Sequence, residues 1–294
     1  MTLTYVALHR THYEYSSEVS DAYSVVHLLP RSTVRQEVVD AVLHADPEAD
    51  EYDERVDEFG NRLVQLGLHR AHTSFTVEAT STVTVEPLVL DGDGPPWEHV
   101  AAMAAGVGGA DAIELGPMLA RTAPIVVTSE LATLDVLASE IFAPDRPILD
   151  ALRDLCGRVF REFDFDPAAT DVSTPLDRVL AQRGGVCQDF AHLAIALCRS
   201  RGVAARYVSG YIETDPPPGE QRTIGADASH AWLAVWVPEQ GWVDLDPTND
   251  QLPTTRHVTV AWGRDYRDVA PVRGVVIGPA ATQSMTVAVD VHRR

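Results

Sequence analysis

The segment that decides the fold is Gly184-Gly-Val-Cys-Gln-Asp-Phe-Ala-His-Leu-Ala-Ile-Ala-Leu-Cys-Arg-Ser-Arg-Gly202. From Cys187 onward, its apolar residues recur at the spacing of a buried helix. Arg199 and Arg201 suit the last turn of such a helix, and Gly202 is typical of the position just after its end. The segment therefore predicts a buried helix that begins at Cys187, directly after two glycines.

A cysteine in the first turn of a helix is well placed to act as a nucleophile. The partial positive charge of the helix N-terminus stabilises a thiolate, and free backbone N–H groups there can hold an oxyanion. Gly185 allows a tight backbone turn and leaves room for a substrate. This segment alone leaves two roles open for Cys187, a nucleophile or a buried core cysteine. The other two cysteines, Cys156 and Cys198, lie on apolar stripes and are predicted to be core residues.

A second segment supplies the partners that a thiolate nucleophile needs. Ser229-His-Ala-Trp-Leu-Ala-Val-Trp-Val-Pro-Glu-Gln-Gly-Trp-Val-Asp-Leu-Asp-Pro-Thr248 alternates like a β-hairpin, with a turn signal at its centre. His230 begins the first strand, and Asp246 ends the second. A cysteine nucleophile requires an imidazole, and the imidazole requires a group that orients it. We therefore predict that Cys187, His230 and Asp246 form a catalytic triad.

The length of the hairpin loop decides whether this triad can form. If the loop runs from Val237 to Gly241, Asp246 lies opposite Trp232 and shares a sheet face with His230. A loop one residue shorter places the carboxylate and the imidazole on opposite faces. The triad therefore requires the odd-length loop or a bulge. Asp244 shares the alternation but lies too far along the strand to reach the histidine.

Composition limits the classes of function. The chain has 294 residues and a formal net charge of −20, which disfavours binding to nucleic acid or to an anionic membrane. All 23 basic residues are arginine. Three cysteines do not make a disulfide framework, and no signal peptide or long apolar run is seen, so a cytoplasmic location is expected.

We expect no metal and no cofactor. Cys187 and His192 point about 140° apart on a helix, which argues against a shared metal site. A glycine-rich phosphate loop followed by lysine is absent from the sequence, so nucleotide binding has no support.

The chain is expected to divide into two domains. Residues 1–92 are rich in strand-forming residues and predict a small antiparallel β-sandwich, which ends at the loop cluster Asp91-Gly-Asp-Gly-Pro-Pro96. Residues 93–294 predict the catalytic domain, with its core at about 145–270 and helices over much of 97–163. The segment Ser284–His292 predicts a terminal strand that closes a sheet.

Three motifs resemble the bacterial transglutaminase-like superfamily: Gly185-Val-Cys-Gln-Asp-Phe-Ala191, His230-Ala-Trp232 and Trp242-Val-Asp-Leu-Asp-Pro-Thr248. The segments at 13–15, 29–31 and 57–61 are similar to the β-rich domain that often precedes this core. The resemblance implies an α+β, papain-like fold with the cysteine helix packed on an antiparallel sheet. It also implies Cys187 as nucleophile, His230 as general acid and base, and Asp246 as the residue that orients the imidazole.

From these features we expect an amide acyl-transfer enzyme that works through a thioester on a peptide, protein or glutamine-type amide. Hydrolysis is the favoured outcome, because water is always present and no site for an amine acceptor can be identified. The alternatives are a transglutaminase that transfers the acyl group to an amine, and a protein-binding module without catalysis. Gly185, Gln188 and Trp232 are the candidate substrate-binding residues. The sequence predicts no oligomeric state.

Overall fold

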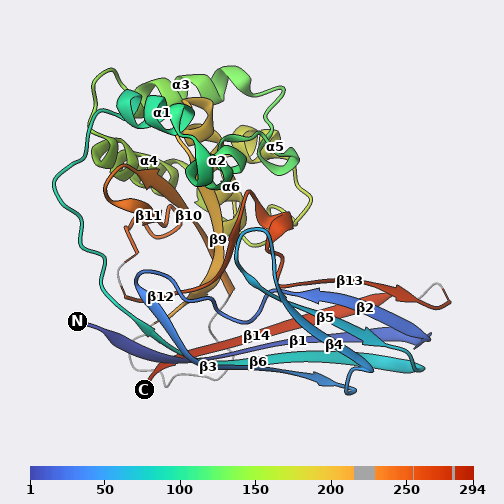
Figure 1. Ribbon diagram of the computed structural model, residues 1–294. Coiled ribbons are helices and arrows are strands. Elements are labelled where there is room, and N and C mark those ends of the chain that lie inside the picture. The colour runs from blue at the N-terminus through green and yellow to red at the C-terminus, as the bar shows by residue number, and fades with distance from the viewer. Residues whose placement is uncertain (215–228, 254, 280–281) are drawn as a thin grey trace, which may run out of the picture.

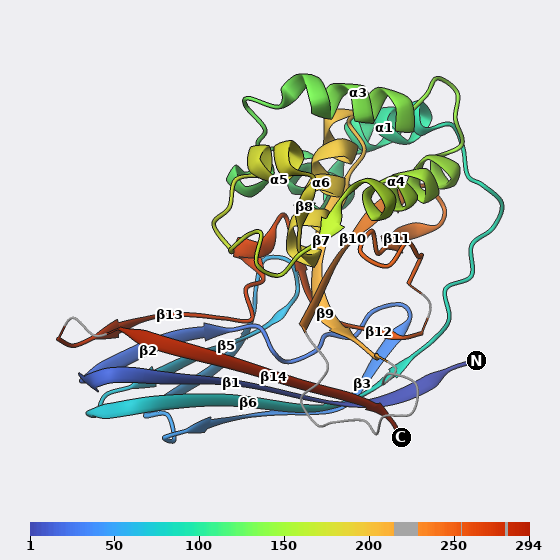
Figure 2. The ribbon, with the colours of Figure 1, turned by 180° about the vertical axis from the view of Figure 1, so that it is seen from behind.

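The computed structural model describes residues 1–214, 229–253, 255–279 and 282–294. It contains a β-sandwich below and a sheet covered by helices above, as Figures 1 and 2 show from opposite sides. The predicted α+β class, with a strand-rich N-terminal region and a helix-covered antiparallel sheet, is confirmed. Within the described ranges, no helix is long and apolar enough to cross a membrane.

The sandwich consists of two four-stranded sheets, with strand orders β14-β1-β6-β3 and β13-β2-β5-β4. Both sheets are antiparallel throughout. Their apolar side chains meet in one interior cluster that includes Val26, Val64 and Val77. The strands are β1 (Leu3–Val19), β2 (Asp21–Val26), β3 (Gln36–Asp46), β4 (Glu51–Val56), β5 (Arg62–Leu68), β6 (His72–Val85), β13 (Val272–Ile277) and β14 (Gln283–Arg293).

The end of the chain returns to the sandwich. β13 pairs with β2, and β14 pairs with β1 from Tyr5↔Arg293 to Tyr15↔Gln283. The predicted terminal strand exists and closes a sheet, but that sheet is built on the N-terminal strands. Sheet pairing therefore joins residues 272–293 to the N-terminal strands. The division at residue 92 that the sequence suggests instead groups these residues with the catalytic domain. The cause is tertiary, because a strand pattern does not tell which sheet a strand will join.

The upper part is built around the sheet β11-β10-β9-β12. Helix α6 packs on β10 and β9, and α3, α4 and α5 pack on α6 (Figure 2). The strands are β9 (Ala205–Ile212), β10 (Ser229–Val237), β11 (Gly241–Leu245) and β12 (His257–Gly263), with a short pair β7 (Asp164–Phe165) and β8 (Gly184–Gly185) beside them. The helices are α1 (Trp97–Gly106), α2 (Gly109–Leu115), α3 (Leu131–Ile141), α4 (Ile148–Glu162), α5 (Leu176–Gln182) and α6 (Cys187–Ser200), with 3₁₀ turns η1 (Gly116–Leu119), η2 (Ala123–Ile125) and η3 (Tyr266–Asp268).

The core cysteines lie where the sequence predicts them. Cys156 on α4 and Cys198 on α6 are both buried in the apolar cluster between the helices and the sheet. Burial raises the pKa of Cys198 to about 12 and that of Cys156 well above its usual value. Neither thiol is therefore available as a nucleophile at neutral pH.

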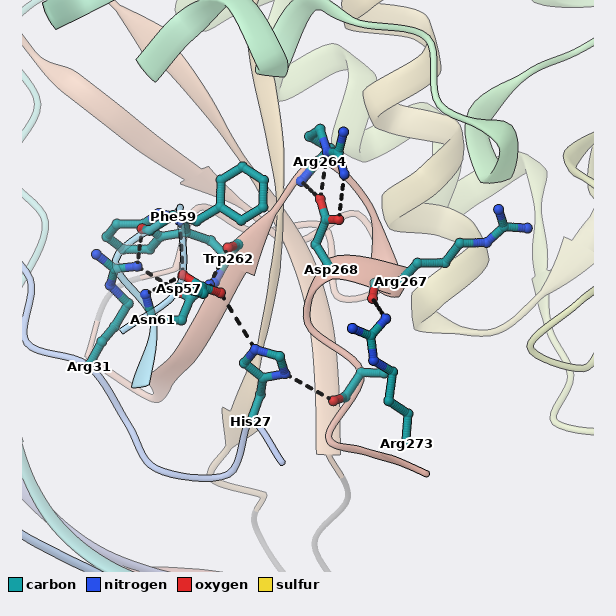
Figure 3. A network of polar contacts seen from close by, with 11 residues as sticks. His27, Arg31, Asp57, Phe59, Asn61, Trp262, Arg264, Arg267, Asp268 and Arg273 are labelled. Carbon is teal, nitrogen blue, oxygen red and sulfur yellow. Dashed lines mark hydrogen bonds and ion pairs between the residues drawn. The ribbon is translucent and has the colours of Figure 1, made fainter. Parts of the chain in front are cut away.

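The two parts of the molecule are fastened by the turn between β4 and β5 (Figure 3). The fully buried Asn61 carboxamide donates to the Trp262 carbonyl (2.8 Å) and accepts from the Trp262 backbone N–H (2.9 Å). Its oxygen also accepts from Arg31 (2.7 Å), and its amide nitrogen donates to Asp57 (2.8 Å). One side chain thus satisfies polar groups from the sandwich and from β12, so this turn is also the joint between the two parts.

Replacing Asn61 by alanine tests this joint. We expect Asn61→Ala to lower the free energy of unfolding by about 2 to 4 kcal/mol, because it leaves buried backbone groups of Trp262 without their partner and removes one hydrogen bond to the Asp57 carboxylate. Chemical denaturation of the purified variant measures the change. The exposed Val34→Ala is the control and shifts stability by no more than about 0.5 kcal/mol. A similar small change in Asn61→Ala would show that the joint is not structural.

Candidate functional site

Cys187 is the first residue of α6, as predicted. Val186 before it is extended, and its N–H donates to the Asp189 carboxylate (2.9 Å), which also accepts from the Thr170 hydroxyl (2.6 Å). Asp189, for which the sequence offered no role, therefore fixes the start of the helix. A Cβ at Gly185 would lie 2.7 Å from the Asp189 carboxylate, so glycine is required there for packing.

The hairpin has the register that the triad requires. Val237 pairs with Gly241 and Leu233 with Leu245, so the register is the one that the odd-length loop gives. His230 Nε2 lies 2.8 Å from Asp246 Oδ2, and both side chains are buried. The predicted diagonal contact between the imidazole and the carboxylate is therefore present.

His230 interacts electrostatically with both of the other predicted triad residues, Cys187 and Asp246. Burial opposes protonation of His230, but hydrogen bonds to Asp246 and Cys187 raise its pKa to about 10. Asp246 is also buried, and its hydrogen bonds with His230 and a second histidine hold the pKa of the carboxyl well below its usual value. Since Nε2 is held by the carboxylate, Nδ1 is the nitrogen left to engage the thiol. The arrangement therefore favours a protonated His230 imidazole at neutral pH.

Two further residues complete the surroundings of Asp246 and were missed from the sequence. His257 Nε2 on β12 lies 2.9 Å from Asp246 Oδ2, and Asn249 Nδ2 donates to the same oxygen (2.7 Å). The other oxygen accepts from the Thr248 backbone N–H (3.0 Å). The contact of Asn249 could have been predicted, because the sequence Asp-Pro-Thr-Asn is typical of a turn whose first side chain accepts backbone hydrogen bonds. The contact of His257 could not have been predicted from a local pattern, since β12, the strand that carries it, pairs with β9 rather than with β10.

The cluster of His230, Asp246 and His257 could also bind a metal by composition, since its ligand atoms all lie within 4.8 Å of one another. The two N···O distances of 2.8 and 2.9 Å are, however, those of direct hydrogen bonds to a shared oxygen. These bonds account for the closeness of the three groups, so the geometry fits an orienting carboxylate better than a metal centre.

Cys187, Gln188 and His230 line one cleft of about 240 Å³. Gln188 therefore lies where a substrate-binding residue is expected. Strands of the sandwich form the opposite wall, which the sequence did not indicate. β1 and β14 contribute His9, Thr11, Tyr13, Met285 and Val287.

Two of the candidate substrate-binding residues lie elsewhere. Trp232 is fully buried, stacks near His230 with ring centroids 6.0 Å apart, and donates its indole N–H to Asp244 (3.1 Å). It supports the imidazole from within the protein and is not among the residues that line the cleft. Gly185 is also buried and does not line the cleft. In both cases packing decides where the residue lies, which strand and loop patterns do not reveal.

Comparison with known families identifies both parts of the chain. The transglutaminase-like superfamily matches residues 135–247, which include the three residues of the predicted triad up to Asp246. The bacterial transglutaminase-like N-terminal region matches residues 5–84 of the sandwich.

Relatives and a solved structure agree with these matches. An uncharacterised protein of Mycobacterium tuberculosis is 41% identical over 99% of this chain and 93% of its own length. Another from Mycobacterium leprae is 33% identical over 97% of each chain. A protein-glutamine gamma-glutamyltransferase of Pseudomonas aeruginosa is 29% identical over 37% of this chain and 18% of its own.

A solved Cytophaga hutchinsonii structure, described as a putative cysteine protease, superposes with a TM-score of 0.75. It is 21% identical and covers 100% of this chain and 91% of the solved chain, so the likeness is one of fold. With a helix that begins at a cysteine, a hairpin that pairs histidine with aspartate, and a sandwich of the matching N-terminal type, the chain belongs to the transglutaminase-like superfamily.

Proposed function

We propose that the protein is a cysteine-dependent amide hydrolase that acts through a thioester. The observation that carries the proposal is the linked series of Cys187, His230 and Asp246 at the edge of one cleft. The thiol opens onto the cleft, while the carboxylate at the other end of the series is fully buried. This order of groups is the one that nucleophilic catalysis by cysteine needs.

In the proposed reaction, the Cys187 thiolate attacks the amide carbonyl carbon and a C–S bond forms. The backbone N–H of Cys187 lies at the free N-terminus of α6, where it can stabilise the oxyanion. The C–N bond then breaks as the His230 imidazolium gives its proton to the leaving amine. Water attacks the thioester carbonyl carbon and His230 takes a proton from it. The C–S bond then breaks, which releases the carboxylic acid and restores the thiolate and the imidazolium.

The cleft itself suits an uncharged group next to the scissile bond. Among the described residues that line it, apart from Cys187 and His230, the side chains are apolar, aromatic, hydroxyl, amide or imidazole, with no carboxylate or guanidinium. In a chain of net charge −20, a lining of this kind favours a neutral amide. Amine transfer is the second candidate, favoured by the local similarity to the Pseudomonas aeruginosa gamma-glutamyltransferase.

Selective alkylation tests the nucleophile. We expect iodoacetamide at pH 7 to modify Cys187 in the folded protein while Cys156 and Cys198 stay unmodified, because the latter two are buried with raised pKa values. Cys187→Ala should reduce turnover by at least about a thousandfold, whereas Cys198→Ala retains it. Peptide mass mapping locates the label. Equal labelling of all three thiols, or full activity of Cys187→Ala, would favour a protein-binding module.

A competition between water and an amine tests the reaction outcome. A glutamine-containing peptide is incubated with the enzyme and a labelled primary amine, and the product masses are measured. We expect the free acid to dominate. Because the chain contains no lysine, its own side chains cannot supply a competing amine acceptor. Amine adducts without free acid would instead identify an acyltransferase.

The pH profile tests the link between His230 and Asp246. A pKa of about 10 keeps the imidazole protonated well above neutrality, so the alkaline limb of kcat/KM should lie near pH 10. Asp246→Asn removes the anionic acceptor and should move this limb to lower pH by at least about one unit. Asp244→Asn, on the same strand pair, is the matched control and leaves the limb in place. An unshifted limb in Asp246→Asn would separate the carboxylate from the catalytic imidazole.

A further inference from the structure

Arg206 carries a buried charge that the structure leaves without a hydrogen-bonding partner. It is the second residue of β9, and only 6% of its side chain is exposed. Its Nε atom is buried without a partner, and no hydrogen bond or ion pair among the described residues involves its guanidinium. A buried, unpaired guanidinium is costly, so its presence calls for an explanation.

Two indole rings enclose this guanidinium. Its central carbon lies 3.5 Å from the ring centroid of Trp262 and 4.2 Å from that of Trp242. The Arg31 guanidinium lies 3.3 Å from the same Trp262 centroid, so it must occupy the other face of that ring (Figure 3 shows the pair Arg31 and Trp262). The side chains therefore stack in the order Arg31, Trp262, Arg206, Trp242. Such stacking stabilises the cations through the ring faces and leaves the guanidinium edges free to donate.

The nearby acidic groups do not pair with these edges because they are already engaged. Asp244 accepts from the Trp232 indole on one oxygen (3.1 Å) and from Arg35 on the other (2.6 Å). Glu114 accepts from the Trp242 indole (2.6 Å). Both acids act on Arg206 only through their charge, and burial lowers the pKa of Arg206 to about 9, which keeps it cationic at neutral pH.

Arg206, Trp242, Trp262 and Glu114 line two cavities, of about 360 and 540 Å³. The first lies between β3, the hairpin β10–β11 and β12, and its wall also includes Arg35 and His257. Neither Cys187 nor His230 lines either cavity, so this space is separate from the cleft at the thiol.

We propose that the smaller cavity binds a small carboxylate-bearing molecule, whose carboxylate pairs with the free edge of the Arg206 guanidinium. A carboxylate is flat and offers two acceptors to two parallel N–H groups, so it fits the edge of a guanidinium held between two rings. Val34 and Val85 in the wall provide apolar contact for the rest of the molecule, and Arg35 adds positive charge. A phosphate would bring a higher charge toward Glu114 and Asp244, which disfavours it.

The proposed site also touches the surroundings of the catalytic carboxylate. His257 lines the cavity on one side and hydrogen-bonds to Asp246 Oδ2 on the other. An occupant of the cavity therefore lies one residue away from the group that orients His230. Binding at this site does not depend on the proposed hydrolysis, and it can be measured without a substrate.

Titration of the full chain with hexanoate tests the proposal, with hexanamide as the uncharged analogue and inorganic phosphate as the alternative anion. The readouts are the quenching of tryptophan fluorescence and the Nε–H signal of Arg206 in a ¹H–¹⁵N spectrum. We expect saturable hexanoate binding with a shift of that signal and much weaker binding of hexanamide. Arg206→Met should weaken hexanoate binding by at least about tenfold, because it removes the charge and keeps the chain length.

Arg153→Met is the control, since Arg153 is an exposed arginine that lines neither cavity, and it should bind hexanoate like the wild type. Arg206→Met removes a cation that the indole rings stabilise but keeps an unbranched side chain between them, so it is expected to fold, and a thermal melt checks this. Equal affinity for hexanoate and hexanamide, or unchanged affinity in folded Arg206→Met, would overturn the site. Binding of phosphate but not of hexanoate would overturn the choice of a carboxylate.

Discussion

The buried carboxylate of Asp246 is the group on which the candidate site depends. A carboxylate with no exposed surface is stable only when its oxygens receive hydrogen bonds, and here they come from two imidazoles, an amide and backbone N–H groups. These donors come from β10, the turn after β11, and β12. Because these donors converge on one carboxylate, the hairpin register, the orientation of His230 and the position of β12 all depend on the charge of Asp246.

The cleft belongs to both parts of the molecule. The helices and central sheet supply the thiol and the imidazole, while β1 and β14 supply the facing wall. The Asn61 joint and the Arg31–Trp262 stack hold these parts together (Figure 3). The sandwich therefore forms part of the cleft as well as a structural support, and any change in its position alters the space in front of Cys187.

The features that could be predicted from the sequence are those set by local geometry. A helix start after two glycines placed Cys187, and the odd-length loop placed Asp246 on the face of His230. The remainder depends on which strands meet in space. His257 reaches Asp246 across the sheet, β14 joins a sheet formed far earlier in the chain, and Trp232 is buried by neighbours such as His257. Alternation along one strand is the same whichever neighbours it acquires.

The pairing of β14 with β1 also has a consequence for the order of events during synthesis. β1 is synthesised before the helices and the central sheet, yet its hydrogen-bonding edge is completed by β14 only after they have been made. Until then β1 presents an unsatisfied sheet edge, and the wall formed by Met285 and Val287 does not exist. The nascent protein thus contains its thiol and imidazole before the strand that encloses them, so the cleft is closed late in synthesis.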